Sequence, residues 1–178
     1  MISDRLDAWL PAATLRTQHR RVATAPPARL WSATRAVSLA ETRTLGRLVR
    51  WRLPGSAAAS TFDELLRSYP FIVLEQGERF SVSGLCGRIW TLTSDYPQLS
   101  GPDDFRSWSE PGTVRVLIAH WVAALPGGRA EVVSEARVRA VDRAAALRLR
   151  ALWLVVGPFD HLIGAEGLSV AVRRAQER

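Results

Sequence analysis

Three residues on two neighbouring segments could do chemistry: His120, Glu135 and Arg137. They fall in TVRVLIAHWVAAL and RAEVVSEARVRAV, which otherwise carry the β-branched and alternating residues typical of strands. An imidazole can anchor a ligand or act as a general acid or base, and a carboxylate can tune it. An arginine offers a rigid fork of donors to a carbonyl or carboxylate. The structural alternative is a wall histidine with one hydrogen bond, beside a salt-bridged pair on the solvent side.

The turn between these two segments decides where the three side chains point. If Leu125 pairs with Arg129 across a three-residue turn, His120 lies alone on an almost wholly apolar face. If the Gly127–Gly128 pair forms a two-residue turn, the register slips by one residue and His120 lies near Glu135. The turn preference of Gly-Gly favours the second register, whereas clean separation of apolar from polar residues favours the first.

Other side chains have both a structural and a functional interpretation. Trp90, Trp121 and Trp153 are candidates for lining a ligand pocket, although large aromatic residues ordinarily belong to a core. Cys86 is expected to be a small buried hydrophobe, because no helix N-terminus or clear basic neighbour would lower its pKa. The Asp160–His161 pair is set aside, since adjacent helical residues point in different directions.

The basic charge is concentrated near the N-terminus and comes from arginine alone, because the sequence contains no lysine. Residues 8–62 hold nine arginines and one acid, Glu41, against a net charge of +7 for the whole chain. A stripe of four of them could dock on an anionic membrane or another anionic surface, although a solvated helix face is commoner. The stripe is Arg43, Arg47, Arg50 and Arg52. No nucleic-acid-binding motif accompanies this charge, so nucleic acid is not an expected partner.

Composition removes several classes of function. Without lysine there is no Schiff-base lysine and no Walker-type phosphate loop. A single cysteine excludes an intramolecular disulfide framework, and with three scattered histidines it leaves no zinc-site spacing. We therefore expect no metal and no cofactor. With no apolar run of signal-peptide or membrane-spanning length, we also expect a cytoplasmic protein.

The order of elements indicates an α+β fold in one domain. We expect a single domain over residues 1–178, with an N-terminal extension at 1–17 and a core at 18–175. The expected elements are a strand at 15–24, helices from 27, 38 and 61, two or three strands within 71–93, a helical turn at 103–108, the hairpin at 113–141 and a C-terminal helix from 143. Pro158 should break or kink that helix. The sheet needs its apolar face covered, and only this helix is long enough.

Several phrases, with this order, resemble the polyketide cyclase/START-like superfamily (helix-grip, SRPBCC, Bet v 1-like), in particular its uncharacterised bacterial members. The phrases are APPARLW, GLCGRIW, EPG, SEARVRAVD and the stretch Trp153–Ile163. The resemblance implies a curved antiparallel sheet wrapped around a long C-terminal helix kinked near Pro158, with short helices after the first strand. It also implies a cavity that in relatives holds lipids, polyketides or hormones. Relatives carry an arginine after the Leu-Ile of the final helix, where this chain has Gly164, so no role for that arginine is carried over.

The function we expect is binding of a hydrophobic or amphipathic small molecule, lipid or polyketide-like, between the sheet and the C-terminal helix. The candidate ligand-binding residues are Trp90, His120, Trp121, Glu135, Arg137 and Trp153. One alternative is a cyclase- or dehydratase-like enzyme, in which His120 acts as acid or base and Glu135 or Arg137 orients the substrate carbonyl. Another is a basic interaction module that docks through Arg43–Arg52. The ligand, the cavity volume and the oligomeric state stay open.

Overall fold

One five-stranded antiparallel sheet organises the protein, with strand order β1-β5-β4-β3-β2. The structure is a computed structural model that describes residues 2–52, 60–91 and 96–177, without the side chains of 50–52, 159 and 161–163. The strands are β1 (Leu15–Ala23), β2 (Ile72–Gly77), β3 (Phe80–Gly87), β4 (Val114–Leu125) and β5 (Arg129–Ala140). The longest two, β4 and β5, pair along their full length and form the centre of the sheet.

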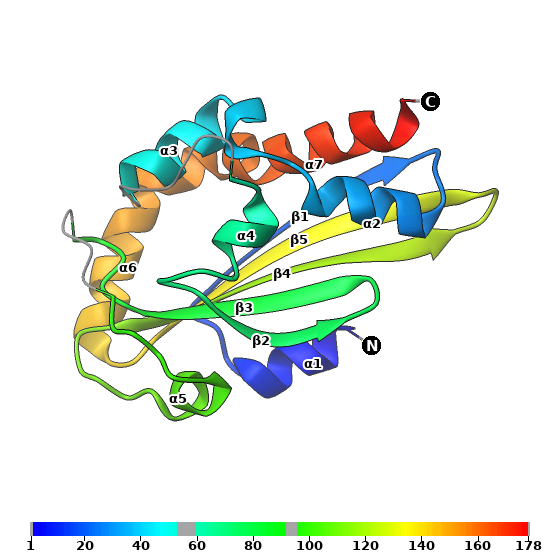
Figure 1. Ribbon diagram of the computed structural model, residues 1–178. Coiled ribbons are helices and arrows are strands. Elements are labelled where there is room, and N and C mark those ends of the chain that lie inside the picture. The colour runs from blue at the N-terminus through cyan, green and yellow to red at the C-terminus, as the bar shows by residue number, and fades with distance from the viewer. Residues whose placement is uncertain (1, 53–59, 92–95, 178) are drawn as a thin grey trace.

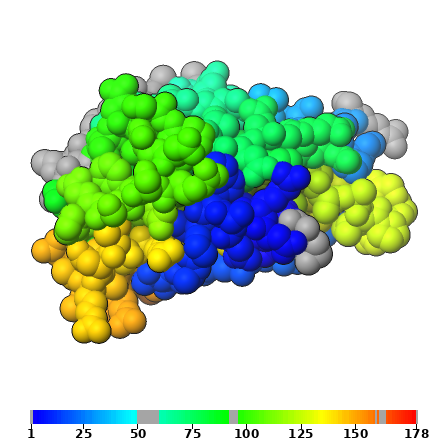
Figure 2. Space-filling view, turned by 90° about the horizontal axis from the view of Figure 1, so that it is seen from below, coloured from blue at the N-terminus to red at the C-terminus, as the bar shows by residue number. Residues whose placement is uncertain are grey.

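Helices cover both faces of the sheet (Figure 1). On one side lie α2 (Pro27–Arg35), η1 (Leu39–Glu41), α3 (Thr44–Arg52), α4 (Phe62–Leu65), α6 (Arg143–Val156), η2 (Gly157–Phe159) and α7 (Asp160–Gln176). On the other lie α1 (Ile2–Trp9) and α5 (Pro102–Ser107). Figure 2 views the molecule from this second side, where α1 and α5 form much of the surface. The expected α+β class and helix-grip arrangement, with a curved antiparallel sheet against the C-terminal helix, are confirmed.

The C-terminal helix is kinked where the sequence predicts it. The Asp142 side chain accepts a hydrogen bond from the Ala145 N–H at 2.7 Å and so begins α6. The pKa of Asp142 lies below its ordinary value because this backbone donor and that of Gly112 favour the carboxylate. The η2 turn, which contains Pro158, then separates α6 from α7, and the two helices run in very different directions (Figure 1). None of the described helices is both long and apolar enough to cross a membrane.

The hairpin adopts the three-residue turn. Leu125 pairs with Arg129 and His120 pairs with Ser134, while Gly127 and Gly128 both have positive φ, +75° and +69°. The two-residue turn favoured by the Gly-Gly pair is therefore wrong. The reason is that a shift of one residue would exchange every side chain between the two faces of β5 relative to β4. Segregation of apolar residues outweighs the local turn preference.

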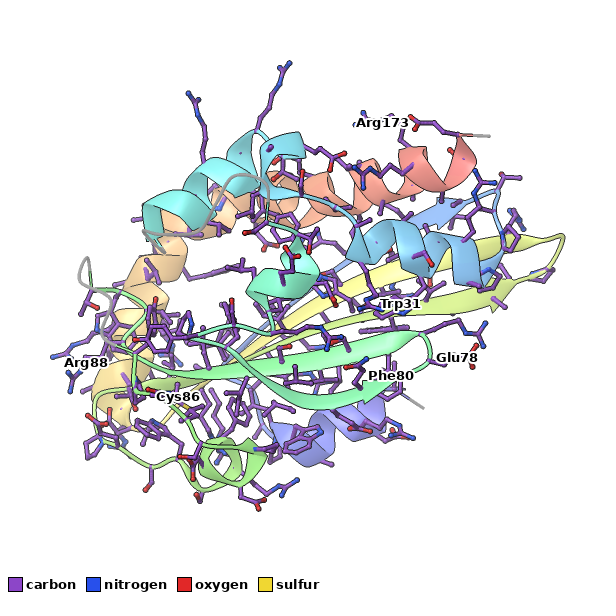
Figure 3. All side chains as sticks on the ribbon, in the orientation of Figure 1. Trp31, Glu78, Phe80, Cys86, Arg88 and Arg173 are labelled. Atoms are coloured by element: carbon purple, nitrogen blue, oxygen red, sulfur yellow. The ribbon has the colours of Figure 1, made fainter. Side chains whose placement is uncertain are left out.

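Apolar side chains pack on both sides of the sheet. The core toward α1 and α5 includes Leu6, Leu10, Cys86, Phe105 and Leu117, all fully buried. Cys86, labelled in Figure 3, is the buried hydrophobe that the sequence predicts, and burial raises the pKa of its thiol to about 12. The opposite face packs against α2, α6 and α7 through separate clusters that include Leu30, Val132, Leu149 and Leu168.

The helix expected from Ser38 begins later. Ser38 and Glu41 do form a capping box, but it caps only the short η1 turn, after which Thr42 is extended. Helix α3 instead begins at Thr44, where the Glu166 carboxylate of α7 accepts hydrogen bonds from the Thr44 and Leu45 N–H groups. A long-range cap has therefore replaced the local one. The box at Thr61 and Glu64 caps α4 as expected.

Replacing Gly127 or Gly128 by Ala should destabilise the protein by about 1–2 kcal/mol each, because a side chain disfavours the left-handed backbone that the turn requires. A Cβ at either position would meet nothing within 4 Å, so the cost is conformational and not steric. Urea unfolding of each variant measures it. Gly101→Ala is the control, since Gly101 is extended and equally open; an equal loss there would contradict the explanation.

Candidate functional site

A largely apolar cavity of about 360 Å³ lies between the sheet and the helices of its α7 side. Its apolar lining comes mainly from α3 and the α4 region: Leu45, Leu48, Val49, Phe62, Leu65 and Leu66. From the sheet, β3, β4 and β5 contribute Leu85, Ile118 and Ala136. From α7, Gly164, Gly167 and Leu168 close the opposite wall. The C-terminal helix and the sheet therefore enclose a pocket as the resemblance implies.

Two pairs of polar side chains line this cavity, and they come from β1, β4, β5 and α7. His19 of β1 and Asp160 of α7 lie at ion-pair distance, with 3.1 Å between His19 Nε2 and Asp160 Oδ2. On the neighbouring strands, His120 Nε2 and Ser134 Oγ share a hydrogen bond of 3.1 Å. The proton on that bond depends on the imidazole tautomer and on the rotation of the hydroxyl. The cavity thus offers two polar pairs on a mostly apolar wall, whose other polar residues are Thr17, Thr34 and Tyr96.

His120 is the one sequence-predicted ligand residue that lines the cavity. Burial lowers the pKa of its imidazole to about 4, and the negative charge of Asp63 on α4 only partly opposes this shift. The ring is consequently neutral at neutral pH and can both donate and accept a hydrogen bond. His120 also borders a smaller hollow of about 30 Å³, which includes Asp63 and Ser81.

The pair of His19 and Asp160 was missed by sequence reasoning. From the sequence, Asp160 is seen only beside its neighbour His161, whose side chain lies outside the described residues, and His19 belongs to no recognisable motif. The β1–β5 register places His19 opposite Ser134 and so on the cavity face. No local signal links residues 19 and 160, because only the packing of α7 along β1 brings them together.

Gly164 is required for the approach of His19 to α7. A Cβ at this position would lie 2.1 Å from His19 Cδ2 and 2.2 Å from Nε2, so the ring fills the space that a side chain would need. This is the position at which the resemblance expects an arginine. The chain has Gly164 there, so no role of that arginine is carried over, and the His19 ring leaves no room for a Cβ at this position.

Glu135 and Arg137 lie on the opposite face of the sheet from the cavity, beneath α1. They are 1% and 2% exposed, and Arg137 Nε donates to Glu135 Oε1 at 2.6 Å. Arg16 and Gln18 of β1 also donate to Glu135, while Arg137 pairs with Asp7 of α1. The pair is salt-bridged, but it is buried and not on the solvent side. In this register neither residue can orient a ligand in the cavity.

The three candidate tryptophans lie outside the cavity lining. Trp90 packs against the core near α6, where the Arg148 guanidinium lies 6.0 Å from its ring centroid. Trp121 packs against the core beneath α1, because its side chain points away from that of His120. Trp153 lies beside Gly157 at the end of α6. Trp90 and Trp121 thus have the core position that the structural interpretation expects, whereas Trp153 is half-buried on α6.

The basic stripe is described only in part. Arg43 and Arg47 are exposed, and the side chains of Arg50 and Arg52 lie outside the description. Arg43 borders a shallow polar groove with Arg21, Arg173, Glu41 and Glu166 (Arg173 is labelled in Figure 3). Burial alone would raise the pKa of Glu41, but hydrogen bonds from Ser38 and the charge of Arg174 lower it below the ordinary value.

Within the described ranges, no group of three or more His, Cys, Asp or Glu residues could hold a metal ion.

Comparison with known proteins gives only distant structural likenesses. No family model and no curated protein matches the chain. Among solved structures, hypothetical protein jhp0584 from Helicobacter pylori is similar at 10% identity and a TM-score of 0.43, over 96% of this chain and 94% of that one. The protein TTHA0849 from Thermus thermophilus has 11% identity and a TM-score of 0.36, over 90% and 97%. Zhui aromatase/cyclase from Streptomyces sp. R1128 has 15% identity and a TM-score of 0.32, over 91% of this chain and 96% of that one. TM-scores of this size support no inference about function.

The low pKa of His120 should make the protein lose stability as the pH falls from about 6.5 to 4. Between these pH values the imidazole is protonated in the unfolded chain but stays neutral in the folded protein, where its pKa is about 4. Acid therefore favours the unfolded state. Replacing His120 by Gln should reduce this loss, by at most about 3 kcal/mol across the window. Urea unfolding at several pH values gives the difference in free energy of unfolding between wild type and variant. The carboxylates contribute equally to both proteins, so their titration cancels in this difference. A difference that is constant with pH would refute the shift.

Removing one partner of the buried pair should cost more than removing both. Glu135→Leu leaves the Arg137 guanidinium buried with only Asp7, and we expect a loss of about 3–5 kcal/mol. The double variant Glu135→Leu, Arg137→Met should recover a large part of that loss, because it leaves no uncompensated buried charge. Urea unfolding of the single and double variants measures both. Additive losses would show that the two side chains act independently.

Proposed function

We propose that this chain binds a hydrophobic or amphipathic small molecule, lipid or polyketide-like, in the cavity between the sheet and α7. The observation that carries the proposal is the cavity itself, which is about 360 Å³ in volume and apolar over most of its lining. Small-molecule pockets typically have volumes of about 300–1,000 Å³, apolar walls and a few placed polar groups. The volume is at the lower end of that range, so it fits a small ligand or one part of a longer one.

The polar groups of the cavity suggest what the ligand would carry. The neutral His120 and the Ser134 hydroxyl can each donate or accept, so a ligand hydroxyl or carbonyl could replace their mutual hydrogen bond. The acid of the second pair, Asp160, already lies at ion-pair distance from His19. An unpaired ligand charge would be costly among the apolar residues of this wall. We therefore propose a ligand with neutral polar groups.

We further propose that the chain is a member of the polyketide cyclase/START-like superfamily, of the bacterial kind that its sequence phrases resemble. Support comes from the order of elements, the kinked helix against the sheet and the cavity between them. Two features of this chain lie outside what the resemblance implies. One is the coverage of the other sheet face by α1 and α5, and the other is Gly164 packed against His19.

Binding without turnover is the function that this geometry supports best. The enzyme alternative needs Glu135 or Arg137 to orient a substrate beside His120, and both lie beneath α1. The alternative of a basic module docking through Arg43–Arg52 gains support only from exposed Arg43 and Arg47. Neither alternative has an observation comparable with the cavity.

Titration with an apolar fluorescent probe, followed by energy transfer from tryptophan, should show saturable one-to-one binding that fatty acids or aromatic polyketides displace. Ala136→Phe should weaken binding at least about tenfold, because the ring would occupy part of the cavity that Ala136 lines. The matched control is Ala124→Phe, on the exposed part of β4, which should leave affinity unchanged. Equal effects of the two variants, or no saturable binding by a folded sample, would refute the proposal. His120→Ala should weaken binding by about a few fold, because it removes one neutral hydrogen bond to the ligand.

A further inference from the structure

The outward face of α6 carries large apolar side chains in solvent. Leu147, Leu154 and Val155 are 65%, 81% and 70% exposed. At about 100° per residue, these three positions and Ala151 fall within one side of the helix. The opposite side is fixed against the protein by Ala145 and Leu149, both buried. Single exposed apolar residues need no explanation, but a continuous stripe along one helix marks an interaction surface.

Arginines border this apolar stripe on both sides. Arg143 and Arg150 follow one edge and Arg148 follows the other, and α6 contains no acidic residue. Among the described residues, no carboxylate lies within ion-pair distance of Arg143 or Arg150. Arg148 is turned toward the protein, with its guanidinium 6.0 Å from the Trp90 ring centroid. Two guanidinium groups beside the stripe are thus open to an anionic partner.

The position of α6 leaves this face accessible. In Figure 1 the helix lies at one end of the molecule, and the tip of the β4–β5 hairpin lies at the other. Figure 2 shows the same separation from below, with α6 in orange and the hairpin in yellow-green at opposite ends. A flat surface could therefore approach α6 without meeting the hairpin.

We propose that the outward face of α6 docks on an anionic phospholipid bilayer. Leucine and valine side chains would enter the boundary between headgroups and acyl chains, while Arg143 and Arg150 would contact lipid phosphates. Helix α6 has the composition of helices that lie at a membrane interface. It has an apolar face with flanking arginines, it contains Trp153, and it lacks acidic residues. A second copy of the chain fits less well, because stacked α6 helices would bring their arginines together without an acid on either helix. The proposal concerns a different helix from the Arg43–Arg52 stripe and does not require a ligand in the cavity.

Flotation with vesicles tests this proposal directly. We expect the protein to float with vesicles of phosphatidylcholine and phosphatidylglycerol, much less with phosphatidylcholine alone, and less as salt is raised. The double variant Leu154→Ser, Val155→Ser should bind about tenfold more weakly or worse, because it removes apolar surface that would leave water. Val22→Ser is the matched control, since Val22 is also exposed, at 45%, but lies on β1.

A second pair of variants tests the charges. Arg143→Ser, Arg150→Ser should weaken binding to the anionic vesicles and flatten its salt dependence, whereas Arg129→Ser at the hairpin tip should change neither. These positions are exposed, and circular dichroism melting curves will check that each variant is folded. Wild-type protein that fails to float with anionic vesicles, or an apolar double variant that floats like wild type, would overturn the proposal. So would light scattering showing a wild-type dimer that the double variant abolishes while vesicle binding is unchanged.

Discussion

The pairing of β4 with β5 is the constraint on which both faces of the molecule depend. Each residue of this hairpin points to the side opposite its neighbours, so one register fixes the surroundings of every side chain along it. With Leu125 opposite Arg129, His120 and Ser134 face α7 while Glu135 and Arg137 face α1. A shift of one residue would place Glu135 and Arg137 in the cavity wall, and Arg16, Gln18 and Asp7 would lose them as partners on the α1 side. The two glycines with positive φ allow the turn that avoids this.

Helix α7 determines the shape of the cavity, because it packs against strand β1 on one side and against helix α3 on the other. Toward the sheet, Gly164 lets the ring of His19 approach the helix backbone, so β1 and α7 pack closely. Toward α3, the Glu166 carboxylate accepts hydrogen bonds from the N–H groups of Arg43, Thr44 and Leu45. An acceptor at a helix N-terminus satisfies donors that have no intrahelical partner. The residues of α3 that line the cavity are thereby held opposite the sheet.

Buried polar groups are compensated differently on the two faces of the sheet. Beneath α1, charges are buried together, and Glu135 is surrounded by donors from Arg16, Gln18 and Arg137. In the cavity, His120 is instead kept neutral by burial and is satisfied by a hydroxyl. Buried charge requires compensation within the protein, whereas a neutral group can exchange its partner for a ligand at little cost. This difference is why the cavity side, and not the more strongly polar α1 side, supports the proposed binding.

The sequence by itself determined the α+β order of elements, the cap at Asp142, the kink at Pro158 and the burial of Cys86, because caps, periodicity and proline act over a few residues. It also left two possible environments for His120, an apolar face or a position near Glu135, depending on the hairpin register. Only the tertiary structure decided between them, and only it paired His19 with Asp160 and capped α3 with Glu166. The periodicity of apolar residues indicates which side chains share one face of a strand or helix. It does not indicate which other elements pack against that face. Contacts between residues more than a hundred positions apart depend on how whole elements pack, for which one sequence carries no local signal.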